Sequence, residues 1–242
     1  MPLLLSHGYS STSGMWEKQI GPLSKQFFLI VWDFRGHGQS DYPEDQSLYS
    51  EAHTVADMLA LLDHLAPGRP AIVGGLSLGG YMSLAFYRLH AERVRALLII
   101  DTGPGFKKDS AREAWNKTAH ETAARFEKQG LAPLQDASPE RSQVTHRNAK
   151  GLALAARGML AQRNDSVFHS LGSIKVPSIV VVGADDKPFL AATDYMVKKI
   201  DGCEKLVVPN AGHAVNIDQP ELFIKGLIPF LEKVDKKDRA RL

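Results

Sequence analysis

Three side chains, far apart in the chain, have the residue types of an activated serine nucleophile. Ser77 lies in "GLSLG", residues 75–79, between the apolar run "PAIV" and the helix-like segment "YMSLAFYRLH". Asp185 and Asp186, either of which could be the acid, follow the run "SIVVVG", and His213 follows the run "EKLVVP". A serine hydroxyl becomes a good nucleophile when a positioned histidine takes its proton, and an acid holds that histidine in the required tautomer. The set therefore predicts acyl transfer through a covalent intermediate.

The glycines around Ser77 distinguish between three kinds of strand-to-helix turn. A phosphate-binding loop needs a lysine after its last glycine, but glycine and tyrosine follow here. A dinucleotide-binding turn needs glycine at its third position, where this chain has Leu76. The G-x-S-x-G pattern of a nucleophile elbow does fit. We expect a strained backbone at the serine, with glycine at 75 and 79 because side chains there would collide with the turn.

The other histidines and the single cysteine have simpler roles. His7 is expected to order its own loop, and His37 to make structural hydrogen bonds beside Asp33 and Arg35. The chain has no H-x-x-x-H pattern or Cys/His cluster, so we expect neither a metal site nor a cofactor. Cys203 precedes an apolar run and is expected to be a bystander.

Short apolar runs recur along the chain and predict the strands that carry these residues. Their nearly continuous apolar character is typical of strands buried on both faces. Helix-length segments such as 48–65 and 81–90 separate most of them, which predicts an α/β fold with a mostly parallel sheet flanked by helices. The runs are Leu3–Leu5, Phe28–Trp32, Ala71–Val73, Ala96–Ile100, Ser178–Val182 and Lys205–Val208.

One long interval, from Ile100 to Ser178, contains only helical patterns. Residues 110–113 have a capping-box sequence and predict a helix that begins at Ser110 and ends at Gly130. The pair at 138–139 predicts a second helix start, and "GLALAARGML" and "DSVFHSLG" predict two further helices. We predict a helical cap at 105–173, inserted after the strand that ends near Ile100, on a core formed by 1–104 and 174–242.

Composition is ordinary for a soluble globular protein, with 44% hydrophobic residues and a net charge of +2. The basic tail "KKDRARL" is interrupted by an aspartate and predicts a solvated end rather than a nucleic-acid arm. The start "MPLLLSHGYS" lacks the features of a secretory signal, and no segment has membrane-spanning length. We expect a cytoplasmic protein with no nucleic-acid or membrane partner.

Five motifs, in order along nearly the whole chain, resemble those of the α/β-hydrolase family. They are "SHGYSSTSGMW", "DFRGHGQSD", "GLSLGG", "VVGADDKP" and "NAGHAVNIDQPE". The resemblance implies an α/β-hydrolase sheet with Ser77 as nucleophile, His213 as base and Asp186 as acid. It also implies an oxyanion hole made by the backbone N–H groups of Tyr9 and Leu78. Asp185 is an alternative acid, and so is Asp101, because some members of the family place the acid after the earlier strand.

A serine nucleophile, where dehalogenases and epoxide hydrolases of this fold have aspartate, implies a serine hydrolase acting on carboxylic esters or lactones. The histidine loop and compact cap most resemble those of small carboxylesterases and 3-oxoadipate enol-lactonases. The synthase of menaquinone biosynthesis is also similar, but it typically has arginine where this chain has Tyr81. Two alternatives are a carbon–carbon bond hydrolase of ring-cleavage products and a ligand-binding member of the fold that no longer turns over.

Apolar cap residues are candidates to contact a small-molecule ester or lactone. Their helical spacing equally fits a packed cap core. Arg157 and Arg163 could receive a substrate carboxylate or face solvent. The apolar candidates are Trp115, Phe126, Met159 and Phe168, with Phe106 and Leu160 beside them.

The chain begins directly on the strand that precedes "SHG", so the first two strands of the family's sheet are absent from this sequence. The family's strand order then leaves the strand at Phe28–Trp32 unpaired on one side, and an exposed edge is a hazard for intermolecular pairing. We expect either a homodimer through this edge or a chain that lacks its true N-terminal segment.

Overall fold

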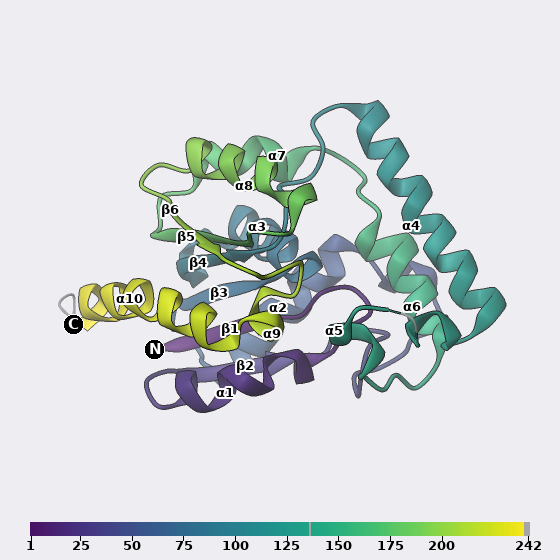
Figure 1. Ribbon diagram of the computed structural model, residues 1–242, viewed down its shortest axis with the longest axis horizontal. Coiled ribbons are helices and arrows are strands. Elements are labelled where there is room, and N and C mark those ends of the chain that lie inside the picture. Colours follow the sequence, from purple (N-terminus) through teal and green to yellow (C-terminus); the bar gives the residue numbers. More distant parts are fainter. Residues whose placement is uncertain (136, 240–242) are drawn as a thin grey trace.

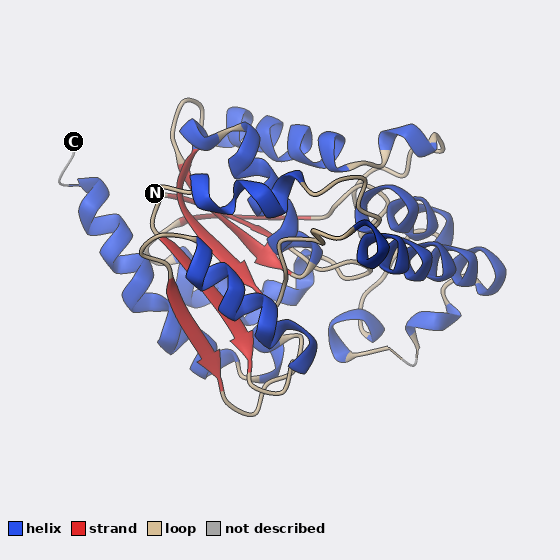
Figure 2. Cartoon of the chain, turned by 90° about the horizontal axis from the view of Figure 1, so that it is seen from above, coloured by secondary structure: helices blue, strands red, loops and turns tan. Residues whose placement is uncertain are grey.

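The computed structural model describes residues 1–135 and 137–239, and its centre is a six-stranded sheet (Figures 1 and 2). Every pair of neighbouring strands is parallel, in the order β2-β1-β3-β4-β5-β6. The six predicted apolar runs all form strands, so the predicted parallel sheet is confirmed. The strands are β1 (Pro2–Ser6), β2 (Phe28–Trp32), β3 (Ala71–Leu76), β4 (Val94–Ile100), β5 (Ser178–Gly183) and β6 (Glu204–Val208).

Helices cover both faces of the sheet, which explains why the central strands are apolar at every position. Successive side chains of a strand point to opposite faces, so Leu4 packs into one hydrophobic cluster and its neighbours Leu3 and Leu5 into another. The first cluster includes side chains from α2 (Glu51–Leu65), α3 (Leu78–Leu89) and α8 (Lys187–Lys199). The second includes side chains from α1 (Glu17–Ser24), α9 (Val215–Asp218) and α10 (Pro220–Arg239).

The interval after β4 forms a helical layer beyond the carboxyl ends of the strands, on the right in Figure 1. It contains α4 (Asp109–Gln129), α5 (Pro139–Ser142) and α6 (Ala149–Ala155), which continues into a π-helical turn over Ala156–Leu160. The prediction that Ser110 caps the first helix is wrong. The helix begins at Asp109, and Lys108 occupies the capping position without a side-chain hydrogen bond.

Residues 166–173 do not lie with this layer. Val167 of α7 (Ser166–Ser170) and Leu171 pack into the hydrophobic cluster of α3 and α8, and the ring of Phe168 stacks on Tyr195 of α8. The division into a core of 1–104 and 174–242 and a cap of 105–173 therefore stays a proposal, and we place the end of the cap before α7.

Short 3-10 turns complete the connections. They lie at Ser13–Trp16, Gln46–Leu48, Ala91–Arg93, Ala132–Leu134 and Leu171–Ser173. Among the described residues, no helix combines the length and the apolar character needed to cross a membrane.

Candidate active site

The turn from β3 into α3 has the predicted strain at Ser77. Its φ of 55° and ψ of −115° lie where side chains other than glycine are rarely found. Glycine is required on both sides because the end of β1 passes close by. A Cβ at Gly75 would lie 2.5 Å from the carbonyl oxygen of Ser6, and a Cβ at Gly79 would lie 2.3 Å from the same oxygen. The crowding that excludes larger residues comes from the neighbouring strand and, at Gly75, also from the turn itself, since a Cβ there would lie 2.6 Å from the carbonyl carbon of Gly79.

The loops after β5 and β6 bring an acid and a histidine together. Asp186, only 6% exposed, has its Oδ2 2.8 Å from Nδ1 of His213. Because a carboxylate only accepts, the imidazole carries its proton on Nδ1 and leaves the lone pair of Nε2 free. Asp185 is exposed, so the geometry assigns the partner of His213 to Asp186.

Asp101, the other candidate acid, is bonded elsewhere. Its Oδ1 accepts a hydrogen bond of 2.8 Å from the backbone N–H of Gly183, and its side chain is fully buried. Burial, with the charge of Asp186 adding to it, raises the pKa of Asp101 to about 9. Burial and the neighbouring Asp186 charge therefore favour the neutral form of Asp101 beside the Asp186–His213 pair.

The backbone N–H groups of Tyr9 and Leu78 are free to bind an oxyanion. Within the described residues neither donates to a protein acceptor. The loop after β1 lies against the serine, since a Cβ at Gly8 would be 3.6 Å from Cβ of Ser77. The carbonyl of Gly8 accepts from Nδ1 of His7 at 2.7 Å. In a trans peptide the N–H points opposite to the C=O, so this bond fixes the direction of the Tyr9 N–H.

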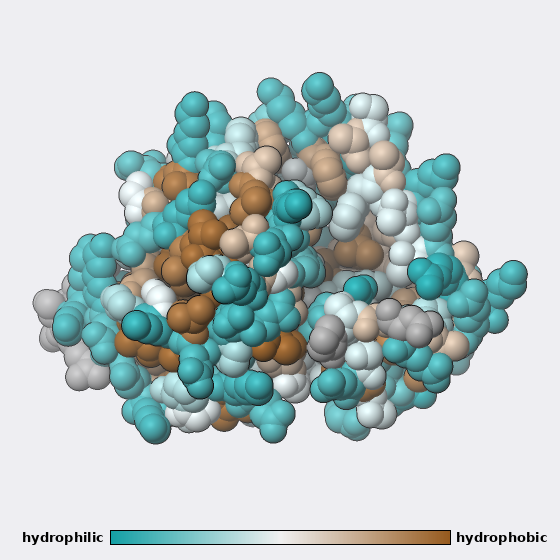
Figure 3. Space-filling model, in the orientation of Figure 1, coloured by the Kyte–Doolittle hydropathy of each residue, from teal (hydrophilic) through white to brown (hydrophobic). Residues whose placement is uncertain are grey.

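A pocket of about 340 Å³ opens over Ser77, between the loop after β4, the start of α4 and the start of α8. Apolar side chains gather in the recess between these parts in Figure 3. The side of the pocket formed by α4 and residues 160–162 is fixed by hydrogen bonds. Trp115 Nε1 donates to the carbonyl of Leu160, and Asn116 and Gln162 are bonded to each other. Its lining is Ser77, Leu78, Tyr81, Thr102, Gly103, Pro104, Gly105, Phe106, Trp115, Leu160, Gln162, Pro188, Phe189 and Ala192.

Phe189 connects the pocket to the histidine. It lines the pocket together with Ser77, and its ring stacks on His213 with the ring centres 5.1 Å apart. No sequence motif singled out Phe189, although its place in the first turn of α8, three residues after Asp186, could have indicated it.

Of the four predicted substrate-contact residues, the structure places Trp115 at the pocket and the other three elsewhere. Phe126 belongs to the small hydrophobic cluster inside the cap. Met159 packs into the cluster of α2 and α3, and Phe168 stacks on Tyr195. Arg157 is bound by both oxygens of Glu127 at the surface and does not line the pocket.

A larger hollow of about 740 Å³ lies beside β2 and α2. Its lining contains the ion pair of Arg35 with Asp57 and, among the described residues, none of the predicted site residues. Size alone therefore does not mark the site. The part of the chain that the structure describes also contains no group of three or more His, Cys, Asp or Glu side chains placed to hold a metal ion.

Comparison with known proteins identifies the family. Residues 1–155 match the family model of the alpha/beta hydrolase fold. The chain belongs to the alpha/beta hydrolase family. The resemblance to small esterases and enol-lactonases of this family is also confirmed.

One similar alpha/beta hydrolase sequence is 3-oxoadipate enol-lactonase 1 of Acinetobacter baylyi, which is 27% identical over 96% of this chain and 89% of its own length. A thermophilic esterase from Thermogutta terrifontis has a similar structure, with a TM-score of 0.79 and 28% identity over 97% of this chain and 90% of that one. The structure of the enol-lactonase of Burkholderia xenovorans LB400 is also similar, with a TM-score of 0.76 and 26% identity over 96% of this chain and 91% of that one.

Proposed function

We propose that this alpha/beta hydrolase cleaves carboxylic esters or lactones through an acyl-enzyme on Ser77. The observation that carries the proposal is the combination of a serine in a strained elbow with a hydrogen-bonded Asp186–His213 pair, joined to one pocket through Phe189. The names of the similar proteins, an esterase and two enol-lactonases, support the same reaction class.

The chemistry assigns one role to each group. Nε2 of His213 takes the proton of Ser77 as Oγ attacks the substrate carbonyl, and the Asp186 carboxylate stabilises the imidazolium that forms. The N–H groups of Tyr9 and Leu78 hold the negative oxygen of the tetrahedral intermediate. His213 then protonates the leaving alcohol and activates the water that releases the acid.

The pocket favours a substrate whose acyl group is small, apolar and uncharged. Among its described lining residues none is Lys, Arg or His, and the polar side chains are Ser77, Tyr81, Thr102 and Gln162. Tyr81 already donates its hydroxyl proton to Glu51. A free carboxylate on the substrate would lose its hydration without gaining a cationic partner. The enol-lactone of a dicarboxylic acid keeps such a carboxylate, so simple esters fit better.

Two p-nitrophenyl esters of similar length test the proposal. We expect p-nitrophenyl valerate to be hydrolysed with a kcat/KM at least tenfold above that of mono-p-nitrophenyl succinate, which carries a terminal carboxylate. Ser77→Ala should lose both activities and remain folded. Ser173→Ala, at an exposed position, is the matched control and should keep them. Full activity in Ser77→Ala would contradict the serine assignment, and preference for the succinate ester would contradict the apolar acyl group.

The same measurements separate the two alternatives. A non-catalytic ligand-binding protein would hydrolyse neither ester. A carbon–carbon hydrolase would turn both over slowly and cleave a ring-cleavage dienone faster.

A further inference from the structure

The loop that carries the Tyr9 N–H contains a second strained residue. Ser10 has a φ of 56° and is 1% exposed. Both of its backbone polar groups are bound by histidines from other parts of the chain. Its N–H donates to Nε2 of His37 at 3.1 Å, and its carbonyl lies 3.2 Å from Nε2 of His146. A left-handed serine costs free energy and persists only when its surroundings hold it.

The hydrogen bonds determine the tautomers of both rings. Since the N–H of Ser10 needs an acceptor, Nε2 of His37 is unprotonated and its Nδ1 donates to the carbonyl of Arg35. The N–H of Gly38 donates to Nδ1 of His146 at 3.1 Å, so the proton of His146 is on Nε2 and points to the Ser10 carbonyl. Each ring therefore works as one donor and one acceptor.

The rings are in contact with one another and with His7. The ring centres of His7 and His37 are 5.1 Å apart, and those of His37 and His146 are 5.7 Å apart. Since His7 holds the carbonyl of Gly8 and His37 holds the N–H of Ser10, the peptides on both sides of Tyr9 are fixed. The N–H of Ser11 also donates to the Gly8 carbonyl, at 3.2 Å, so imidazoles and a backbone turn together determine the direction of the Tyr9 N–H.

His146 differs from the other two because it comes from the cap, between α5 and α6. Two more hydrogen bonds join the same loop to this part of the cap. The Tyr9 hydroxyl donates to the carbonyl of Leu152 at 2.8 Å, and the Ser11 hydroxyl donates to the carbonyl of Glu140 at 2.7 Å. The second half of the cap is thus bonded to the loop that supplies one oxyanion donor.

We propose that His146 is a positioning residue for the oxyanion hole, through which the cap holds the Gly8–Ser10 loop in its active geometry. The inference rests on the proposed function. Loss of the Nε2–H bond to the Ser10 carbonyl lets the strained loop relax and moves the Tyr9 N–H away from the developing oxyanion. An interaction made mainly in the transition state changes kcat more than KM.

Two substitutions separate the two hydrogen bonds of His146. His146→Gln places an amide N–H near the position of Nε2 and can still donate to Ser10. His146→Asn places an oxygen near Nδ1, so it keeps the bond from Gly38 and loses the donor to Ser10. We expect His146→Asn to lower kcat for p-nitrophenyl valerate at least tenfold with KM changed less than twofold. His146→Gln should stay within about threefold of the wild type.

A transition-state analogue gives a readout that a merely structural role would not change. A trifluoromethyl ketone of matching chain length forms a tetrahedral adduct with the serine, whereas the corresponding methyl ketone binds without one. In His146→Asn the inhibition constant of the trifluoromethyl ketone should rise in parallel with the loss of kcat/KM. That of the methyl ketone should be unchanged.

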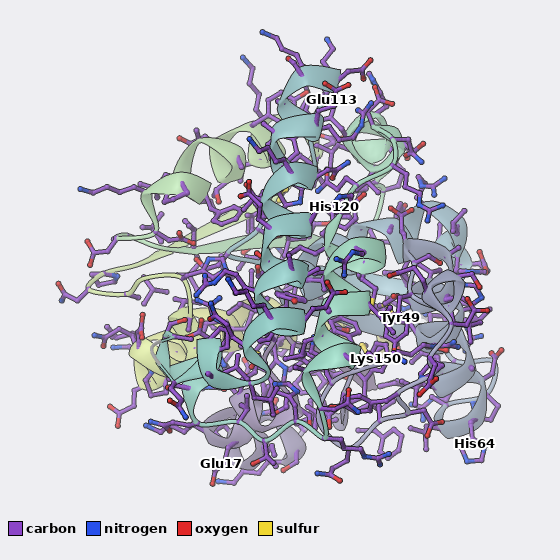
Figure 4. All side chains as sticks on the ribbon, turned by 90° about the vertical axis from the view of Figure 1, so that its right-hand side faces the viewer. Glu17, Tyr49, His64, Glu113, His120 and Lys150 are labelled. Atoms are coloured by element: carbon purple, nitrogen blue, oxygen red, sulfur yellow. The ribbon has the colours of Figure 1, made fainter. Side chains whose placement is uncertain are left out.

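His120→Asn is the control, because His120 is an exposed histidine on α4 of the same cap (Figure 4). It should behave as the wild type. If His146→Asn fails to fold, His146→Met replaces it, since methionine has the length of glutamine without its donor. Equal activity of the donor-lacking and Gln variants, or equal weakening of both ketones, overturns the proposal. A wild type that hydrolyses no ester contradicts the proposed function instead.

Discussion

Asp186 and Asp101 show how two buried aspartates in one site take different roles. Asp186 binds the histidine as a carboxylate acceptor, whereas Asp101 is held neutral by burial and accepts from Gly183. An amide can replace a neutral carboxylic acid without changing charge, but it cannot replace a carboxylate that must stabilise an imidazolium.

We therefore expect Asp101→Asn to keep kcat within about threefold at pH 7, and Asp186→Asn to lose at least 100-fold. Steady-state hydrolysis of p-nitrophenyl valerate measures both. A larger loss of kcat in Asp101→Asn than in Asp186→Asn would show that Asp101, and not Asp186, is the carboxylate that stabilises the imidazolium.

The sequence identified residues whose role depends on local motifs better than residues whose role depends on packing. Ser77, Asp186 and His213 lie at strand ends within recognisable patterns, and the strand order brings the last two into contact. Phe126 and Trp115 share one helix, yet only Trp115 reaches the pocket. Eleven residues apart, the two side chains lie on the same face of α4 but about 16 Å apart along its axis. Their difference arises from where along the helix the pocket lies, which spacing alone does not determine. His146 has no motif, so only the fold reveals its partners.

At the scale of elements, the close approach of β1 to the elbow sets how the site is built. We expect Gly79→Ala to lower the free energy of unfolding by at least about 2 kcal/mol, because its Cβ would overlap backbone atoms that cannot move aside. Gly172→Ala is the matched control, since a Cβ there meets nothing within 4 Å. Urea unfolding followed by circular dichroism measures both. Equal stability of the two variants would contradict the crowding at the elbow.

Element boundaries were predicted less well than element types. Ser110 was expected to cap α4, but the helix starts one residue earlier and has no side-chain cap. The end of the cap at 173 stays a prediction, and the packing of α7 on α3 and α8 is the reason to place that end earlier.

At the scale of the whole molecule, the buried histidines predict that acid destabilises the fold. Burial lowers the pKa of His7 to about 4, and it also lowers the pKa values of His37 and His146. Below about pH 6.5 the unfolded chain binds protons that the folded chain does not. The free energy of unfolding should therefore be highest above pH 7. It should fall towards pH 4, by up to about 1.4 kcal/mol per pH unit for each histidine.

His146→Gln removes one of these groups and should make the pH dependence shallower, as urea unfolding at pH 7.5, 6 and 5 would show. Asp33, which faces the same cluster, has burial raising its pKa, but hydrogen bonds from Ser13 and Gln39 lower it overall. Its titration therefore lies below this window. Equal slopes for wild type and variant would contradict the histidine origin of the effect.

The sheet has an exposed edge at β2, so a homodimer through this edge stays a prediction. β2 pairs only with β1 among the described strands, and Phe28 on it is 49% exposed. We expect size-exclusion chromatography to give a dimer, and Phe28→Lys to shift it towards the 26.6-kDa monomer. A wild type that elutes as a monomer at micromolar concentration would exclude pairing through this edge.

Covalent labelling tests most directly the proposal that Ser77 is the nucleophile of an ester hydrolase. The protein is treated with a fluorophosphonate, assayed for p-nitrophenyl valerate hydrolysis, then digested and analysed by mass spectrometry. We expect one phosphonyl group per chain, located on Ser77, with activity lost in proportion to labelling. Labelling of another residue, or full activity in a protein that is completely labelled at Ser77, would contradict it.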